Sequence, residues 1–155
     1  MKTKSIDTPL SEITMRRYEK PYNLTKRELV RKLCLSLGLL NPGDSRDVIV
    51  DVLYVLLEAA KDKALLSSDK IREDVLAFRK QEKLNDFGTA ASNIRRQIRR
   101  LRELLLVEKI KNEYRITEFS NLTETFNEKI EKFMIPSIIE RIKEYLSVID
   151  ETFMK

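Results

Sequence analysis

The 155-residue chain contains no histidine and only one cysteine, Cys34. The missing histidine excludes His-dependent catalytic triads and His-ligated metal sites. A single cysteine excludes an intramolecular disulfide and fits a reducing compartment. No other group of side chains forms a catalytic constellation. We therefore expect no enzyme activity, no metal site and no cofactor.

Glycine is also scarce, and the three glycines (Gly38, Gly43 and Gly88) do not form a phosphate-cradling loop. No apolar run approaches the roughly 18 residues that a membrane span needs. The first residues, "MKTKSIDTPLSE", lack the apolar core of a signal peptide. These features predict a protein with no membrane partner. They predict a cytoplasmic location, on the nucleoid if the source is prokaryotic.

Charged side chains, by contrast, are abundant. They make up 35% of the chain, the formal net charge is +5 and the pI is about 9.3. This balance favours an acidic partner such as nucleic acid. Residues 1–46 carry 10 basic and 5 acidic side chains, whereas residues 122–155 carry 5 and 7. The C-terminal segment is therefore the part least suited to touch phosphate.

Residues 1–24 contain Pro9 and Pro21 and show no hydrophobic periodicity, which predicts an extended arm. The arm could bring basic and aromatic side chains to phosphates or bases, or it could pack across the domain surface. The side chains concerned are Arg16, Arg17, Tyr18, Lys20 and Tyr22.

Two helices are predicted next. The first runs over 25–38, with a capping box from Thr25 to Glu28 and Gly38 at its end, and a turn continues to residue 46. The second runs from about Asp47 to Lys63, capped by Asp44 or Ser45. It is apolar nearly all round, which indicates burial on more than one side. A dimer contact could cover its third side.

After a short extended step at 65–66, a helix over 69–81 is predicted, with Ser67 or Ser68 as its N-cap. A connecting turn ends at Gly88, and a further helix runs from Thr89, as its cap, to about residue 106. Two short strands follow around a turn at Lys111–Asn112.

The stretch "NIRRQIRRLREL" (93–104) gives the helix over 89–106 two opposite faces. At 100° per residue, Ile98, Leu101 and Leu105 fall close to Ile94 and define a buried face. The other face begins with short polar groups and continues with arginines that repel one another at i,i+4. An anionic partner would turn that repulsion into attraction. Alternatively, acidic side chains elsewhere in the fold pair with these arginines.

Residues 122–153 are predicted to be helical, with an interruption at Pro136. Before the proline, Leu122, Phe126, Ile130 and Phe133 share one face. After it, apolar residues alternate three and four apart, which predicts a helix that dimerises or packs on its own domain. The residues expected to dimerise are Ile135, Ile138, Ile142, Tyr145, Leu146 and Ile149.

The order of elements from 47 to 117 is helix, short strand, helix, turn, helix and hairpin. This order resembles the winged helix–turn–helix family of DNA-binding domains. The resemblance implies that the third helix enters the major groove and that the hairpin, or wing, contacts an adjacent groove or the backbone. The expected fold is mainly α, a winged helix domain over 47–121 with a small β-hairpin wing. The arm (1–24), an additional helix and turn (25–46) and long C-terminal helices (122–155) flank it.

The expected function is sequence-dependent or general binding of double-stranded DNA by a homodimeric transcription regulator, with helix 89–106 in the major groove. The residues expected to bind DNA are Thr89, Ser92, Asn93, Arg95, Arg96, Arg99, Arg100, Lys109, Lys111 and Asn112. Two alternatives remain. A winged helix can bind an acidic protein partner in a replication or transcription assembly, or the module can bind RNA.

Overall fold

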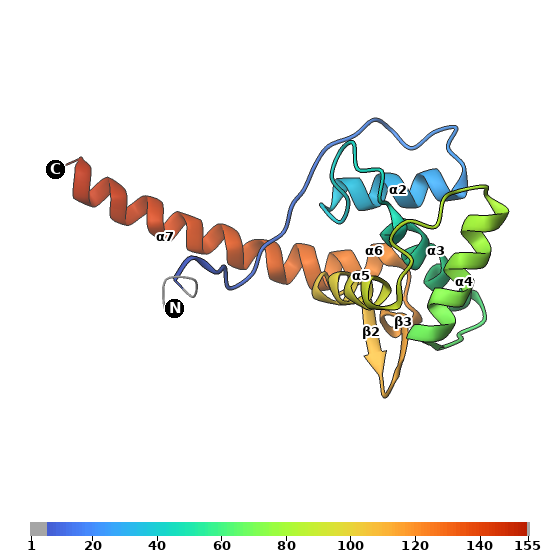
Figure 1. Ribbon diagram of the computed structural model, residues 1–155. Coiled ribbons are helices and arrows are strands. Elements are labelled where there is room, and N and C mark those ends of the chain that lie inside the picture. The colour runs from blue at the N-terminus through green and yellow to red at the C-terminus, as the bar shows by residue number, and fades with distance from the viewer. Residues whose placement is uncertain (1–5, 155) are drawn as a thin grey trace.

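The computed structural model describes residues 6–154; residues 1–5 of the predicted arm and residue 155 of the C-terminal segment lie outside that range. The fold is mainly helical, with one small antiparallel sheet. Figure 1 shows a rounded body, from which one long helix projects.

Helix α2 (Lys26–Ser36) begins at the predicted capping box. The Thr25 hydroxyl accepts a hydrogen bond from the Glu28 amide, and the Glu28 carboxylate accepts one from the Thr25 amide. Gly38 follows the helix with φ +73°, as the sequence predicted. A Cβ there would lie 2.4 Å from the Thr14 side chain, so glycine also lets the arm approach closely.

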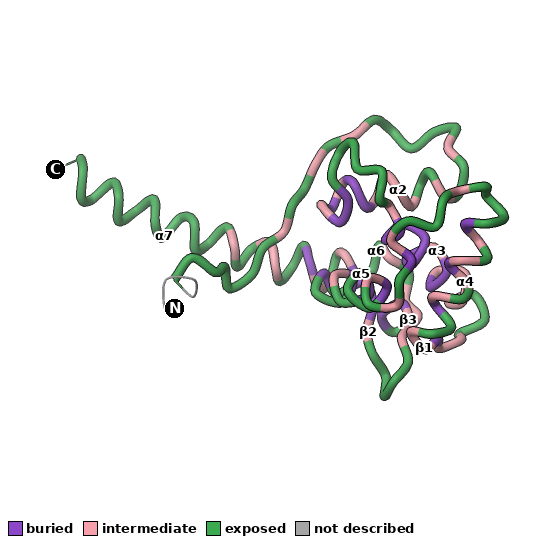
Figure 2. Tube along the Cα trace, viewed as in Figure 1, coloured by how far each residue is buried: buried purple, intermediate pink, exposed green. Residues whose placement is uncertain are grey.

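Helix α3 (Val48–Lys61) is the central element, as its apolar surface predicted. It packs against α2, α4, α5 and β3, so elements of the same chain cover its several sides. Figure 2 shows the buried residues concentrated there. The predicted cap is wrong. Asp47 occupies the N-cap position, and its carboxylate binds Arg27 and Arg79 instead of the helix N-terminus.

Strand β1 (Leu66–Ser67) leads directly into α4 (Ser68–Gln81), whose N-cap is Ser67 as predicted. Strands β2 (Val107–Ile110) and β3 (Glu113–Ile116) form the predicted hairpin, and Lys111 in its turn has φ +59°. The extended step at β1 also pairs with β3, which gives the strand order β1–β3–β2. The small sheet thus ties the hairpin to the body.

The C-terminal segment starts with a short 3-10 turn, Thr117–Phe119, and α6 (Leu122–Thr125). A π-type stretch, Phe126–Met134, continues without a break into α7 (Ile135–Phe153). Pro136 is the second residue of α7, directly after the π-type stretch, and the helical path runs through it, so the predicted interruption is wrong. The wider π-type turn carries Phe133 away from the face of buried Ile130, and Phe133 is 76% exposed, contrary to the prediction.

Helix α7 contains no buried residue. Of the residues expected to dimerise, Ile135 and Ile138 are half-buried. Ile142, Tyr145, Leu146 and Ile149 are exposed. The alternative that the C-terminal helices pack on their own domain holds for residues 122–134, where Thr125 and Ile130 are buried. It is wrong for α7, because that helix points away from the body (Figure 1).

Candidate nucleic-acid interface

The outer face of helix α5 (Ala91–Glu103) is the most strongly basic surface that the sequence singled out. Ile94, Ile98 and Leu101 are at most 1% exposed and fix the helix on the core, as predicted. Gln97 is buried beside them. The opposite side of the helix therefore has to face away from α3 and α4.

The helix is shorter than predicted at both ends. Its N-cap is Ala90, without a side-chain cap, and Thr89 is buried. The Thr89 hydroxyl donates to the Asp86 carbonyl (2.6 Å), and its own carbonyl accepts from Arg72 (2.7 Å). Thr89 is thus a structural residue of the α4–α5 connection and cannot present its side chain to a ligand, contrary to the prediction.

At the other end, the chain leaves the helix after Glu103. Leu105 has φ +66° and is 37% exposed, so its predicted place on the buried face is wrong. Its neighbours Leu104 and Leu106 enter the core instead. The helical wheel misplaced Leu105 because the helix ends at Glu103, two residues before it.

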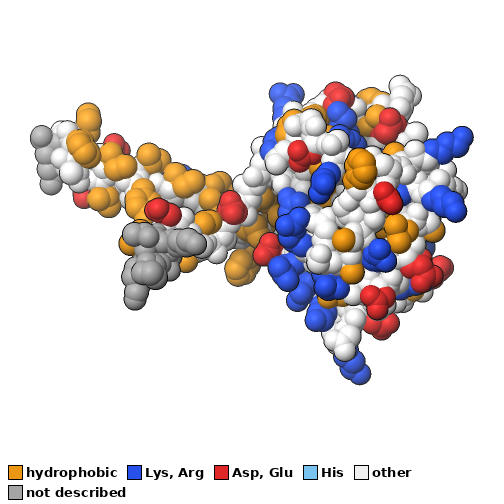
Figure 3. Space-filling model, viewed as in Figure 1, with side chains coloured by type: hydrophobic (Ala, Val, Ile, Leu, Met, Phe, Trp, Pro, Cys, Tyr) orange, Lys and Arg blue, Asp and Glu red, His pale blue; other side chains and the backbone are white. Residues whose placement is uncertain are grey.

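Arg95, Arg96 and Arg99 point outward and are exposed, as predicted. Together with Ser92 and Asn93 they line an open hollow of about 400 Å³. Figure 3 shows Lys and Arg side chains gathered around α5. Short polar groups thus stand at the start of the outer face and three guanidinium groups follow.

No ion pair between described residues involves an arginine of α5. Arginines elsewhere do pair with acids: Arg27 and Arg79 with aspartates of the α3 N-terminal region, and Arg115 with Glu108. The alternative that acidic side chains of the fold neutralise the arginine helix therefore fails within residues 6–154. The i,i+4 repulsion between the exposed guanidinium groups is uncompensated there.

Two of the expected contact residues are engaged inside the protein. The Asn93 side chain donates to the Gly88 carbonyl (2.7 Å) and accepts from Arg96 (2.7 Å) and Gln97 (3.0 Å). Arg100 is half-buried; it donates to Gln97 (3.0 Å) and to the Gly38 carbonyl (3.3 Å). Asn93 is thus better placed to orient Arg96 than to read a base, and Arg100 ties α5 to the end of α2.

The hairpin tip carries the other expected contacts. Lys109, Lys111 and Asn112 are exposed, and the Lys109 ammonium lies 5.9 Å from the Tyr114 ring centroid. Partial burial disfavours the charged form of Glu108, but the Glu118 amide and the Arg115 guanidinium outweigh it and hold the Glu108 pKa below its usual value. Because Arg115 neutralises this carboxylate at 2.6 Å, the acid near the tip opposes an anionic ligand less than an unpaired carboxylate would.

Much of the arm packs across the domain surface, which was one of the two predicted possibilities. Arg16 donates to the carbonyls of Leu35 (2.8 Å) and Leu40 (3.1 Å). The Tyr18 ring lies 4.8 Å from the Lys32 ammonium. Of the five basic and aromatic side chains expected to contact nucleic acid, Arg17, Lys20 and Tyr22 are exposed.

Arg46, which sequence reasoning missed, joins the same surface. It is exposed on the loop before α3 and lines a small pocket of about 180 Å³ together with Asn93, Arg96 and Arg100. Fifty positions separate Arg46 from Arg96, and no periodicity links them. Only the packing of α3 against α5 places the two arginines on one pocket.

The described residues form neither a metal site nor an activated cysteine. Among residues 6–154, no group of three His, Cys, Asp or Glu side chains could hold a metal ion. Cys34 is fully buried, and this burial raises the pKa of its thiol to about 12. The thiol is therefore a core group and not an activated nucleophile.

Comparison with known proteins adds no relative: no family model, no curated protein and no solved structure matches the chain. Within the described range, no helix has the length and apolar character that crossing a membrane requires.

Proposed function

We propose that the chain is a double-stranded DNA-binding protein of the winged helix type, with α5 in the major groove and the β2–β3 hairpin as the wing. The observation that carries this proposal is the outer face of α5, where Arg95, Arg96 and Arg99 are exposed and have no acidic partner among the described residues. Guanidinium groups can fork onto phosphate or onto the guanine edge.

The order of elements supports the same proposal. Helix α3, strand β1, helices α4 and α5 and the hairpin follow one another in the order typical of a winged helix, and β1 joins the hairpin through β3. Lys111 and Asn112 at the exposed tip suit contact with a phosphate backbone. We further propose that the protein acts as a homodimer in transcription regulation in the cytoplasm, on the nucleoid if the source is prokaryotic.

The test is fluorescence anisotropy with a labelled random-sequence duplex, at salt concentrations from about 50 to 300 mM. Each phosphate contact contributes about −0.9 to the slope of log affinity against log salt. We expect a slope of about −4 or steeper for the native chain. The double variant Arg95→Ala/Arg99→Ala should lose about two contacts' worth of slope and most of the affinity.

The matched control is Lys26→Ala/Lys61→Ala, which removes the same total charge from two exposed side chains outside the α5 hollow. If both double variants weaken binding equally, net charge explains it and the proposed interface fails. No binding at low salt by the native chain would reject the DNA proposal as a whole. Competition with structured RNA separates the RNA-binding alternative.

A further inference from the structure

Helix α7 carries a stripe of apolar side chains that its own domain leaves uncovered. The stripe is spaced four, three, four, three and four residues apart and consists of Ile135, Ile139, Ile142, Leu146, Ile149 and Phe153. Apolar residues at this alternating spacing are the pattern of a coiled-coil seam. The five stripe residues from Ile139 to Phe153 are 47–77% exposed, and no residue of α7 is buried.

The opposite side of α7 is charged. Glu140, Glu144 and Glu151 all lie far from the stripe on a helical wheel, and all three are exposed. A single helix of this length, without packing on its apolar face, is only marginally stable in water. A contiguous exposed stripe of this kind marks an interaction surface.

We propose that α7 pairs with α7 of a second copy as a short antiparallel coiled coil. In this register, Ile142 packs on the partner's Leu146, Ile139 on the partner's Ile149 and Ile135 on the partner's Phe153. This inference specifies the homodimer contained in the proposed function. It requires no DNA binding, so the two can fail separately.

The spacing of the stripe fits a second copy of α7 as the occupant. Four, three, four, three and four reads the same from either end of the helix, so two antiparallel copies match every stripe residue with another stripe residue. The three glutamates of the charged face stay in water in this arrangement, so pairing does not bury them. The two Lys143 side chains approach at the centre, but one exposed like-charge pair weighs little against six apolar layers.

The N-terminal end of α7, called its base here, favours an antiparallel over a parallel arrangement of the two helices. Ile135 already packs against the core of its own domain, and the exposed part of the stripe begins at Ile139. A parallel pair would have to bring two whole domains together at this shielded end. An antiparallel pair brings only the narrow end of one helix to each domain.

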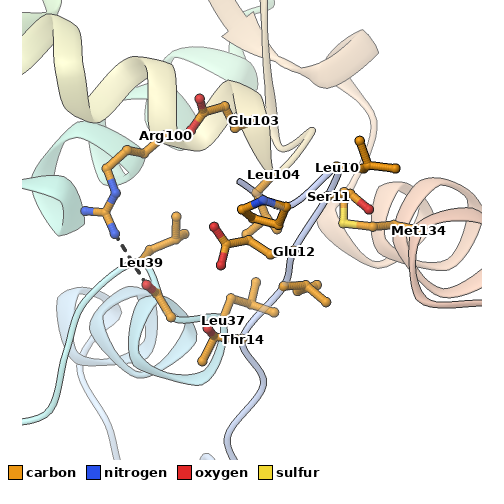
Figure 4. Close-up of a pocket in the computed structure, with 13 residues that line it drawn as sticks. Leu10, Ser11, Glu12, Thr14, Leu37, Leu39, Arg100, Glu103, Leu104 and Met134 are labelled. Atoms are coloured by element: carbon orange, nitrogen blue, oxygen red, sulfur yellow. Dashed lines mark hydrogen bonds between the residues drawn. The ribbon is translucent and has the colours of Figure 1, made fainter. Parts of the chain in front are cut away.

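The surface next to the base has apolar side chains that this helix end could contact. A pocket of about 530 Å³ lies between the arm and α5, and Met134 is part of its lining. In Figure 4, Leu10 and Met134 lie at the side of the pocket nearest the C-terminal helical segment, and Arg100 lies at the other side. The Leu10 side chain is 93% exposed. At the far end of α7, Phe153 is 77% exposed and Met154 is 80% exposed. The antiparallel register brings the partner's Phe153 and the partner's Met154 to the N-terminal end of α7, near Leu10.

The direction can be measured by pulsed electron paramagnetic resonance on the full chain without DNA. A nitroxide is attached at Glu144→Cys in one variant and at Glu151→Cys in a matched one, since both sites are exposed, outward-facing and one heptad apart. In the proposed register, the two Glu144 sites lie at the same level along the axis, on opposite outer sides of the helix pair. The two Glu151 sites lie about 21 Å apart along the axis. Cys34 is fully buried and should not react with the label. The native chain, treated with the same label, is the control for this.

A clearly longer distance at Glu151 than at Glu144 is the expected result. Equal distances at the two sites would mean a parallel pair and would overturn the proposal. A monomer mass in sedimentation, with no measurable interspin distance at either site, would also overturn the proposal. It would mean that another partner covers the stripe.

A second pair of variants tests the stripe itself. Ile142→Asp places a carboxylate in a central layer and should raise the dimer dissociation constant by at least about tenfold, the equivalent of roughly 1.4 kcal/mol. Val148→Asp makes a similar apolar-to-acid change outside the stripe, where Val148 is 60% exposed, and should leave the dimer intact. Equal weakening by both variants would contradict the proposed seam.

Discussion

The arginines of this protein fall into two groups that differ in their partners. Arg27 and Arg79 converge on the N-terminal region of α3, where both bind Asp47 and Asp51. Asp51 is completely buried and Arg79 is 2% exposed, and Arg79 also donates to the Asn85 carbonyl at 2.7 Å. Arg95 and Arg99 of α5 are exposed and have no acidic partner among residues 6–154.

The difference shows that arginine content alone does not define a binding surface. The guanidinium groups at α3 have their charge balanced and their hydrogen bonds satisfied within the fold, so they bind α2 and α4 to the central helix. Those on α5 repel one another and remain free to bind an external anion. The four predictions that follow test this contrast, from the largest expected effect on stability to the smallest.

Replacing Asp51 should have the largest effect. In Asp51→Ala the buried Arg79 loses a carboxylate that it binds directly, and breaking a buried pair from one side costs about 3–5 kcal/mol. Urea denaturation followed by circular dichroism measures this loss. The control is Glu58→Ala, which removes the exposed partner of Lys26 and should cost less than about 1 kcal/mol. Similar losses in both variants would mean that the buried cluster contributes no more than a surface pair.

Acid should weaken the same cluster. Burial opposes ionisation of Asp47, but Arg27 and Arg79 outweigh it and keep its folded-state pKa below the usual aspartate value. A lowered pKa gives stability that is present above the unfolded pKa of about 3.9 and is lost as the pH falls toward the folded value. The free energy of unfolding should therefore decrease below about pH 5. In Asp47→Asn this part of the pH dependence should disappear; an unchanged slope would assign it to other carboxyl groups.

Arg100 should behave as an intermediate case. Its guanidinium donates to the Gly38 carbonyl and to Gln97, so Arg100→Ala should lower stability by about 1 kcal/mol, the typical net value of a hydrogen bond. Its effect on the salt slope of DNA binding should be smaller than that of Arg99→Ala. If Arg99→Ala lowered stability more than Arg100→Ala did, the assignment of Arg100 to the fold and of Arg99 to ligand binding would be contradicted.

The smallest effect is expected for the exposed arginines. Arg95→Ala/Arg99→Ala removes an i,i+4 like-charge pair, so stability should stay unchanged or rise by a few tenths of a kcal/mol. Thermal unfolding at low and high salt measures this effect, which should shrink as salt screens the charges. A loss of more than about 1 kcal/mol would mean that these side chains have structural partners and would weaken the proposed interface.

Local signals in the sequence were sufficient for much of the fold. The capping box at Thr25, the N-cap at Ser67 and the buried stripe of α5 were predicted correctly, because each depends on residues within a few positions of one another. The errors lie at element ends. Thr89 and Leu105 were assigned to α5, but the connection before the helix and the left-handed residue after it follow from contacts with α4 and the hairpin.

The candidate site shows the same division. The sequence identified the exposed arginines of α5, since a helical wheel separates them from the isoleucines. It could not identify Arg46, because the loop before α3 meets α5 only in the folded chain. Nor could it show that Asn93 and Arg100 are engaged internally, since their partners Gly88 and Gly38 have backbone carbonyls that no side-chain pattern reveals.

By itself, the sequence determined the helices, the hairpin and the opposite faces of α5 and α7, because backbone periodicity and short-range hydrogen bonds set these features locally. Only the tertiary structure decided which charges are compensated. Asp47 and Asp51 lie 20–32 positions from the arginines that they bind, whereas no acid within residues 6–154 forms an ion pair with an arginine of α5. An ion pair requires two groups within about 4 Å, and for residues so far apart in the chain only packing sets that distance.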